Sequence, residues 1–148
     1  MKKILIALFC IIAIDQKDGN AQIPLVNDTL DYLETIVNRK AEFIGRPFSV
    51  LKDSLQFQIR YFHPREGIVY DITKETSTKI AFYFPQVADD MYLTYPSLEI
   101  YWQTALNATQ SNELYRQTDG GGWSSTVAAF YSNAIIKDIK LRELFLKI

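Results

Sequence analysis

Residues 98–104 read LEIYWQT, and this stretch decides the fold class because apolar and polar side chains alternate along it. Successive side chains of a β-strand point to opposite faces of the sheet, so a half-buried strand shows a period of two. Leu98, Ile100 and Trp102 would share the buried face. The pattern predicts a strand that covers a core with one face only.

Three further stretches predict strands around it. Residues 79–84 (KIAFYF) are apolar nearly throughout, which is typical of a central strand. Residues 56–63 alternate and are followed by Pro64, which should end that strand before a turn. Residues 135–144 are rich in isoleucine, which favours a strand, although a helix also fits the spacing. Shorter candidate strands are residues 68–70 and 91–94.

Helical spacing is clearest near the start of the globular part of the chain. Asn27 or Asp28 is an N-cap candidate, and the apolar residues that follow recur at intervals of three and four. Gly45 would end this helix, and Pro47 would open a second, short helix over residues 48–55. Two later stretches are weaker helix candidates, namely residues 111–117 and 124–132.

The expected fold class is α+β, with an N-terminal helical pair packed on a mostly antiparallel sheet of four to five strands. The loops between successive strands are too short or too polar to be crossover helices, which argues against a parallel sheet. Composition is even over residues 22–148, without an internal repeat or a linker. This part of the chain is therefore expected to form a single globular domain.

Residues 1–21 carry the features of a cleavable signal peptide. Two lysines precede an unbroken apolar run over residues 4–14, which is followed by a polar stretch and the small residues Gly19 and Ala21. The run is too short to cross a bilayer, which needs roughly 20 apolar residues. We therefore expect cleavage between Ala21 and Gln22, and a mature domain that is periplasmic or secreted.

The single cysteine, Cys10, lies in the segment expected to be removed. A lipoprotein signal at this cysteine is the alternative, but Phe9 stands where lipid attachment needs a small residue. The mature domain would then have no disulfide and would depend on its core for stability. Removing three lysines and two aspartates from a chain of net charge −1 leaves −2, and no basic cluster suggests nucleic acid or a membrane surface.

No motif in the sequence fixes a reaction. His63 is the only histidine and has no H-x-x-x-H partner, which favours a strand-end histidine over a general base or a metal ligand. Asp89 and Asp90 lack oxygen ligands at alternating positions around them, which favours a solvated turn over a calcium site. Nucleophilic-serine and phosphate-loop patterns are absent. We therefore expect no catalytic residue, no metal site and no cofactor.

Aromatic residues are the one excess in the composition, at 14% of the chain. Tyrosine and tryptophan near loops and strand edges can anchor a protein partner, but the same rings can also cap the core. The sequence leaves both interpretations open. The candidate binding residues are Tyr92, Tyr95, Tyr101, Trp102, Tyr115, Gly120, Gly121, Gly122 and Trp123.

The glycine run that precedes Trp123 is the most informative loop. Ordering three consecutive glycines is costly unless the backbone must take a positive φ, approach another segment closely or move. Trp123 is either buried, as the anchor of a tight turn, or exposed, as a binding element that swings on the glycines. In both arrangements we expect the loop to border the ligand-facing surface.

These observations favour an exported, non-catalytic binding or accessory domain of the bacterial envelope, which recognises a protein or peptide through loops rich in Tyr and Trp. A glycan is a less favoured ligand, neither nucleic acid nor stable membrane insertion is expected, and the domain is expected to be a monomer. The alternative is a small hydrolase that acts on envelope polymers through dispersed carboxylates. A pocket with two facing carboxyl groups, or with His63 bonded to one, would favour the hydrolase.

Overall fold

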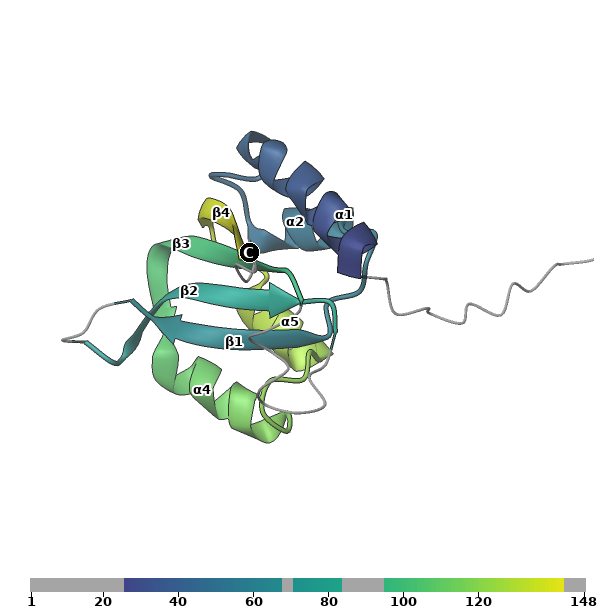
Figure 1. The fold of residues 1–148 in the computed structure, drawn as a ribbon. Coiled ribbons are helices and arrows are strands. Elements are labelled where there is room, and N and C mark those ends of the chain that lie inside the picture. Colours follow the sequence, from purple (N-terminus) through teal and green to yellow (C-terminus); the bar gives the residue numbers. More distant parts are fainter. Residues whose placement is uncertain (1–25, 68–70, 84–94, 143–148) are drawn as a thin grey trace, which may run out of the picture.

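The computed structural model describes residues 26–67, 71–83 and 95–142 (Figure 1). Some of the sequence predictions concern segments outside these residues. They are the signal peptide and its cleavage site, the short strands at residues 68–70 and 91–94, the acidic pair Asp89 and Asp90, and the candidate binding residue Tyr92.

The described residues form four α-helices and one antiparallel sheet, which confirms the α+β class. The helices are α1 (Val26–Asn38), α2 (Phe48–Ser54), α4 (Ala108–Gln117) and α5 (Ser125–Tyr131), and the 3-10 helix η1 (Lys40–Glu42) lies between the first two. The strands are β1 (Tyr61–Glu66), β2 (Lys74–Ala81), β3 (Ser97–Asn107) and β4 (Ile136–Arg142).

The strands lie side by side in the order β1-β2-β3-β4, and every neighbouring pair is antiparallel. The two strands with the clearest sequence signals, β2 and β3, are the central ones. Leu98 lies opposite Ile80 of β2, and Ile100 lies opposite Ile139 of β4. All four side chains are buried, so the apolar face expected for residues 98–104 is the face that covers the core.

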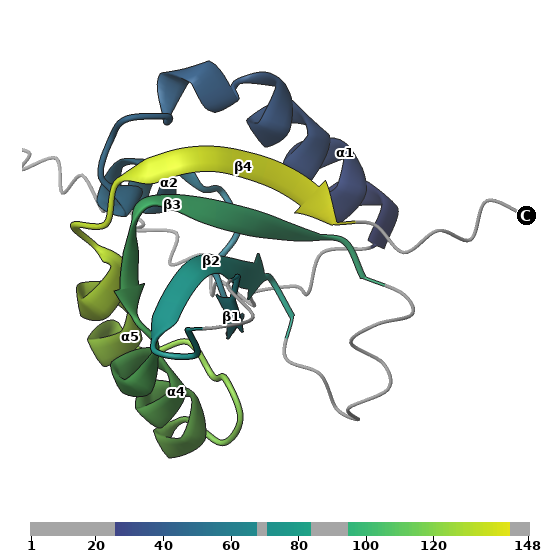
Figure 2. The ribbon, with the colours of Figure 1, turned by 90° about the vertical axis from the view of Figure 1, so that its left-hand side faces the viewer.

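Helices from the start of the chain complete this core together with α5. Leu33 of α1 and Phe48 of α2 belong to the same buried cluster as Ile100 of the sheet and Val127 of α5. Figure 2 shows α1 running beside β4, whereas α4 and α5 lie together on the side of β1 and β2. The sheet and both groups of helices therefore share one hydrophobic core.

The expected bounds of the first strand are wrong, because β1 starts at Tyr61 and continues through Pro64 to Glu66. The backbone N–H of Phe62 points away from β2 and donates to the carbonyl oxygen of Gly121. The residue two positions later, Pro64, has the same orientation in the strand. Its missing N–H therefore lies on the outer edge of the sheet, where a proline costs no hydrogen bond to β2.

The expected bounds of the second strand are also wrong, because β2 starts at Lys74 and not at Lys79. The side chains of Glu75, Ser77 and Thr78 are buried within it although all three are polar. A search for apolar residues therefore finds only the second half of the strand. Burial of these polar groups requires hydrogen-bond partners, which Glu75 finds on the helices that pack against the sheet.

The ambiguous stretches are resolved by the structure. Residues 135–144 contain the strand β4, as their isoleucine content favours. Residues 111–117 belong to α4, which starts earlier, where the side chain of Asn107 accepts a hydrogen bond from the backbone N–H of Gln110 at 3.1 Å. The Ser124 hydroxyl caps α5 in the same way, at 3.3 Å from the backbone nitrogen of Val127.

Candidate functional site

The glycine loop after α4 pairs with the outer edge of β1. The N–H of Phe62 donates to Gly121, and the N–H of Trp123 donates to Arg60, at 2.9 and 3.0 Å. Gly121 has a φ of 111°, and a Cβ at this position would lie 2.5 Å from the carbonyl oxygen of Phe62. Gly120 has a φ of 81°. The loop therefore needs glycine both because φ is positive and because the backbone of β1 lies close to it.

Trp123 packs this loop against the core. Its ring is half-buried and stacks on Tyr131 at 6.2 Å between ring centroids, with an interplanar angle of 14°. Phe48 and Phe62 meet it edge-on, each at 6.0 Å. Trp123 is thus neither fully buried nor exposed: part of its ring packs against the core, and the tight turn of the glycine loop precedes it.

The remaining aromatic candidates do not form one surface. Trp102 lies in the core, where its indole N–H donates to the Thr78 hydroxyl at 2.9 Å, so its ring is not available on the surface. Tyr95 packs on Tyr83 at 4.3 Å between ring centroids. The hydroxyl of Tyr101 accepts a hydrogen bond from Arg142. At least some of the aromatic residues that were candidates for binding therefore pack inside the protein and not on a shared surface.

Tyr115 is the candidate that stays closest to the glycine loop. Its hydroxyl lies 3.2 Å from that of Tyr61, and its backbone carbonyl accepts hydrogen bonds from Gly120 and Gly121. Tyr115 thus joins the end of α4 to the edge of β1 and to the loop. Together with Trp123, these residues connect the sheet to the two short helices.

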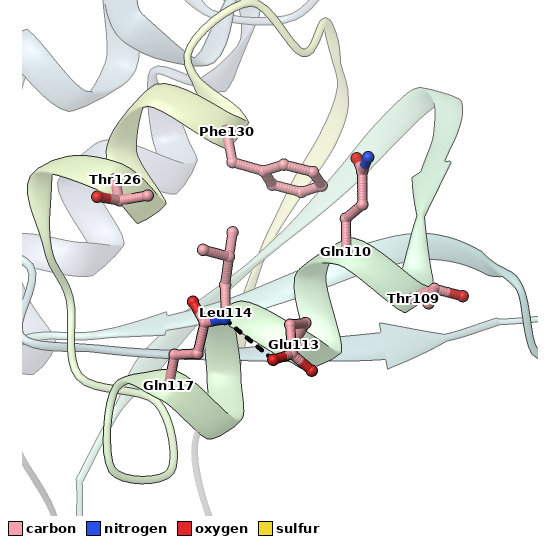
Figure 3. Close-up of a pocket in the computed structure, with 7 residues that line it drawn as sticks. All are labelled: Thr109, Gln110, Glu113, Leu114, Gln117, Thr126 and Phe130. Carbon is pink, nitrogen blue, oxygen red and sulfur yellow. Dashed lines mark hydrogen bonds between the residues drawn. The ribbon is translucent and has the colours of Figure 1, made fainter.

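An apolar groove lies between α4 and α5, and it was not predicted from the sequence. Its volume is about 550 Å³. The Leu114 side chain of α4 points toward α5, and the Phe130 ring of α5 extends toward Gln110 of α4 (Figure 3). The side chain of Gln117 donates to the carboxylate of Glu113 at 3.0 Å along one rim. The groove is lined by Thr109, Gln110, Glu113, Leu114, Gln117, Thr126 and Phe130.

The groove was missed because its residues look ordinary one by one. Positions 110, 113, 114 and 117 follow the spacing of one face of a helix, but only one of them is apolar. Phe130 belongs to a different, shorter helix. The helical spacing around Leu114 is the one signal in the sequence that could have indicated a shared face.

A buried carboxyl group lies beneath the two helices that form the groove. Glu75 of β2 has no exposed surface, and its Oε1 accepts hydrogen bonds from Thr78 and from the hydroxyl of Tyr131, the latter at 2.9 Å. Ser111 of α4 lies close enough to this carboxyl group to lower its pKa, but its hydroxyl donates to the Ala108 carbonyl oxygen at 3.3 Å, and Oε2 has no hydrogen-bond partner. Burial raises the pKa of Glu75 above its usual value.

His63 lies on β1, with its ring edge-on to that of Tyr115 at 5.2 Å between centroids. Its Nδ1 atom is buried and has no hydrogen-bond partner. Burial lowers the pKa of His63, and the positive charges of Arg65 and Lys79 lower it further. Among the described residues, no carboxyl group bonds to the ring, and a general base would need such a partner to orient it.

Ion pairs elsewhere on the sheet have a structural explanation. Glu99, almost fully buried, accepts hydrogen bonds from Arg142 and from the Ser77 hydroxyl, and these bonds lower the pKa of Glu99 despite its burial.

Over residues 26–67, 71–83 and 95–142, no three side chains of His, Cys, Asp or Glu are close enough together to hold a metal ion. Within the same ranges, no helix has the length and hydrophobicity that a membrane span requires.

Comparison of the chain with protein-family models, with curated proteins and with solved structures gave no match. The function is therefore inferred from the geometry of the groove and of the residues beneath it.

Proposed function

We propose that this chain is an exported, non-catalytic binding domain that recognises a protein or peptide, and that the groove between α4 and α5 takes an apolar side chain of that partner. The observation that carries this proposal is the groove itself, with Leu114 and Phe130 at its centre. Apolar anchors that enter a concave site from a partner commonly supply most of the binding energy of an interface.

The surroundings of the groove support a binding role. Gln110, Glu113 and Gln117 surround the apolar centre with groups that can donate or accept hydrogen bonds. An apolar centre with a polar rim is the usual anatomy of a protein interface. Phe130 also contacts Tyr131 edge-on, at 4.9 Å between ring centroids, so the centre of the groove rests on the core.

The same groove does not favour the hydrolase alternative. Glu113 is the carboxyl group among its lining residues, and hydrolysis of a glycan would need a second carboxyl group within roughly 5–10 Å. We therefore expect a protein or peptide partner to bind at α4 and α5, and not at the loops rich in Tyr and Trp.

A matched pair of lysine substitutions tests the proposal. Peptides are first selected on the protein from a phage-displayed library of random peptides. Thr126→Lys places a long charged side chain in the groove, whereas Ser125→Lys adds the same charge at an exposed neighbouring position on α5 that does not line it. The selected peptides should bind the Thr126 variant at least about tenfold more weakly, which corresponds to roughly 1.4 kcal/mol, and should bind the Ser125 variant like the unmodified protein.

Two results would contradict the proposal. One is a selection that enriches no peptide with an apolar residue. The other is a set of peptides that bind both lysine variants with unchanged affinity, because the site would then lie elsewhere.

A further inference from the structure

Glu75 is the most unusual buried group in the described part of the chain. Its carboxyl group is fully buried, yet Oε2 has no hydrogen-bond partner. A buried oxygen without a hydrogen-bond partner destabilises the folded state, so such a group in a native protein usually has a functional or structural role. The position of Glu75 suggests what this role is.

The carboxyl group of Glu75 lies beneath the two helices of the groove. The Tyr131 hydroxyl of α5 donates to it at 2.9 Å, and the buried Ser111 of α4 lies close enough to it to lower its pKa. Tyr131 is the direct neighbour of Phe130, and Ser111 is buried one turn before Leu114 on α4. A change in the charge of the Glu75 side chain is therefore expected to alter the positions of Leu114 and Phe130 at the centre of the groove.

We infer that Glu75 is a positioning residue for the groove: its protonated carboxyl group holds α4 against α5, and loss of the proton moves the two helices apart. This inference rests on the proposed function only for the use of the groove, because the coupling itself concerns the geometry of the free protein. The strand that carries Glu75 is hydrogen-bonded to a neighbour on each side, whereas α4 and α5 are short helices that each bury two residues. A charge on Glu75 is therefore expected to displace the helices and not the strand.

The groups around Glu75 determine the direction of the effect. From β2 it faces the Thr78 hydroxyl, which in turn accepts the indole N–H of Trp102 from β3. The helices contribute the hydroxyls of Ser111 and Tyr131. Desolvation raises the pKa of Glu75. Hydrogen bonding to these uncharged groups lowers the pKa by less, so the net shift is upward. The nearby Lys74 is exposed and paired with Asp71 at 3.2 Å.

Ionisation would leave a charged Oε2 without a donor in a site that water does not reach. The least costly response is to let water in by separating α4 from α5. The groove should therefore be narrow when Glu75 is protonated and wider when it is ionised. A partner that fits the narrow form would bind more tightly at lower pH.

The test uses carbon-13 NMR signals of the Leu114 methyl groups and the Phe130 ring in the free protein, recorded over a pH titration from about 4 to 8. Both sets of signals should shift together, with one midpoint above the usual glutamate value of 4.5. Glu75→Gln, which keeps the shape but cannot ionise, should abolish this transition. Glu113→Gln is the matched control, because it removes the carboxyl group on the rim of the groove and should leave the transition in place.

A second variant keeps the test decisive if Glu75→Gln does not fold. Tyr131→Phe removes only the hydroxyl that links Glu75 to α5, so the Phe130 signals should lose most of their pH-dependent shift while those of Leu114 retain it. The inference is overturned if the signals do not titrate above pH 4.5, if Glu75→Gln leaves the transition unchanged, or if Glu113→Gln removes it. Because no partner is present, a failure here is distinct from a failure of peptide binding.

Discussion

Gly121 is the residue at which the backbone geometry is most demanding. It has a φ of 111°, and a Cβ added to it would lie only 2.5 Å from the carbonyl oxygen of Phe62. The need for glycine in this loop is predictable from the sequence, since three consecutive glycines are otherwise costly. The reason for the need is not predictable, because the edge of β1 that pairs with the loop is distant along the chain.

Replacing Gly121 with alanine should therefore destabilise the protein by about 3 kcal/mol, through strained φ and overlap with the backbone of β1. Gly45→Ala is the matched control. Gly45 also has a positive φ, of 79°, but nothing lies within 4 Å of a Cβ placed there. Gly45→Ala should lower the free energy of unfolding by only about 1–2 kcal/mol. Urea denaturation of both variants measures the difference, and equal losses would show that the close contact with β1 is unimportant.

His63 makes stability depend on pH in a predictable direction. Its pKa in the folded protein lies below the usual value of 6.5, so between these two values the unfolded chain binds more protons than the folded one. The contribution of His63 to stability is therefore fully present above pH 6.5 and is lost as the pH falls toward the folded-state pKa. Urea denaturation of His63→Gln over the same pH range should show a smaller loss on acidification, whereas an unchanged pH profile would contradict the assignment.

At the scale of elements, sequence patterns were sufficient where one face of the element is apolar and insufficient where polar side chains are buried. In β3, Leu98, Ile100 and Trp102 are buried on one face as expected. In β4, Ile136 and Ile139 are both buried although they are three positions apart, because the register between β3 and β4 shifts there. The first half of β2 was not predicted, because Glu75, Ser77 and Thr78 are buried through hydrogen bonds that a hydrophobic pattern cannot show. The groove could not be predicted for a similar reason, since its centre is made by one apolar residue from each of two helices.

The start of α4 provides a prediction at this scale. Asn107→Ala removes the side chain that caps the helix and should cost about 1 kcal/mol, because the N–H of Gln110 loses its acceptor. Asn107→Asp keeps an acceptor and should retain most of the stability. Thermal unfolding of the two variants separates a lost cap from a general intolerance of substitution, which would destabilise both equally.

At the scale of the whole molecule, the α+β class and the antiparallel sheet were predictable because alternation and short loops leave few other arrangements. The placement of the aromatic residues was not. Rings such as Trp102 and Tyr131 occupy the core beside Phe48, where they stack and meet edge-on. Polar tips on buried aromatic rings find partners only in the folded structure, so the sequence left their location open.

Export is the prediction that concerns the chain as a whole. If residues 1–21 form a cleavable signal peptide, protein isolated from its native host should begin at Gln22 and should contain no cysteine. Intact-mass measurement checks both points. A mass that includes Met1, or one that includes a lipid attached to Cys10, would contradict the expected processing.

Binding of the partner in the groove between α4 and α5 can be observed by NMR. A selected peptide is added while the signals of the Leu114 methyl groups and the Phe130 ring are followed, alongside those of the Trp123 indole at the glycine loop. We predict that the signals of Leu114 and Phe130 move to saturation with the peptide while that of Trp123 changes little. Saturating changes at Trp123, with Leu114 and Phe130 unmoved, would contradict binding in the groove and would place recognition at the loop instead.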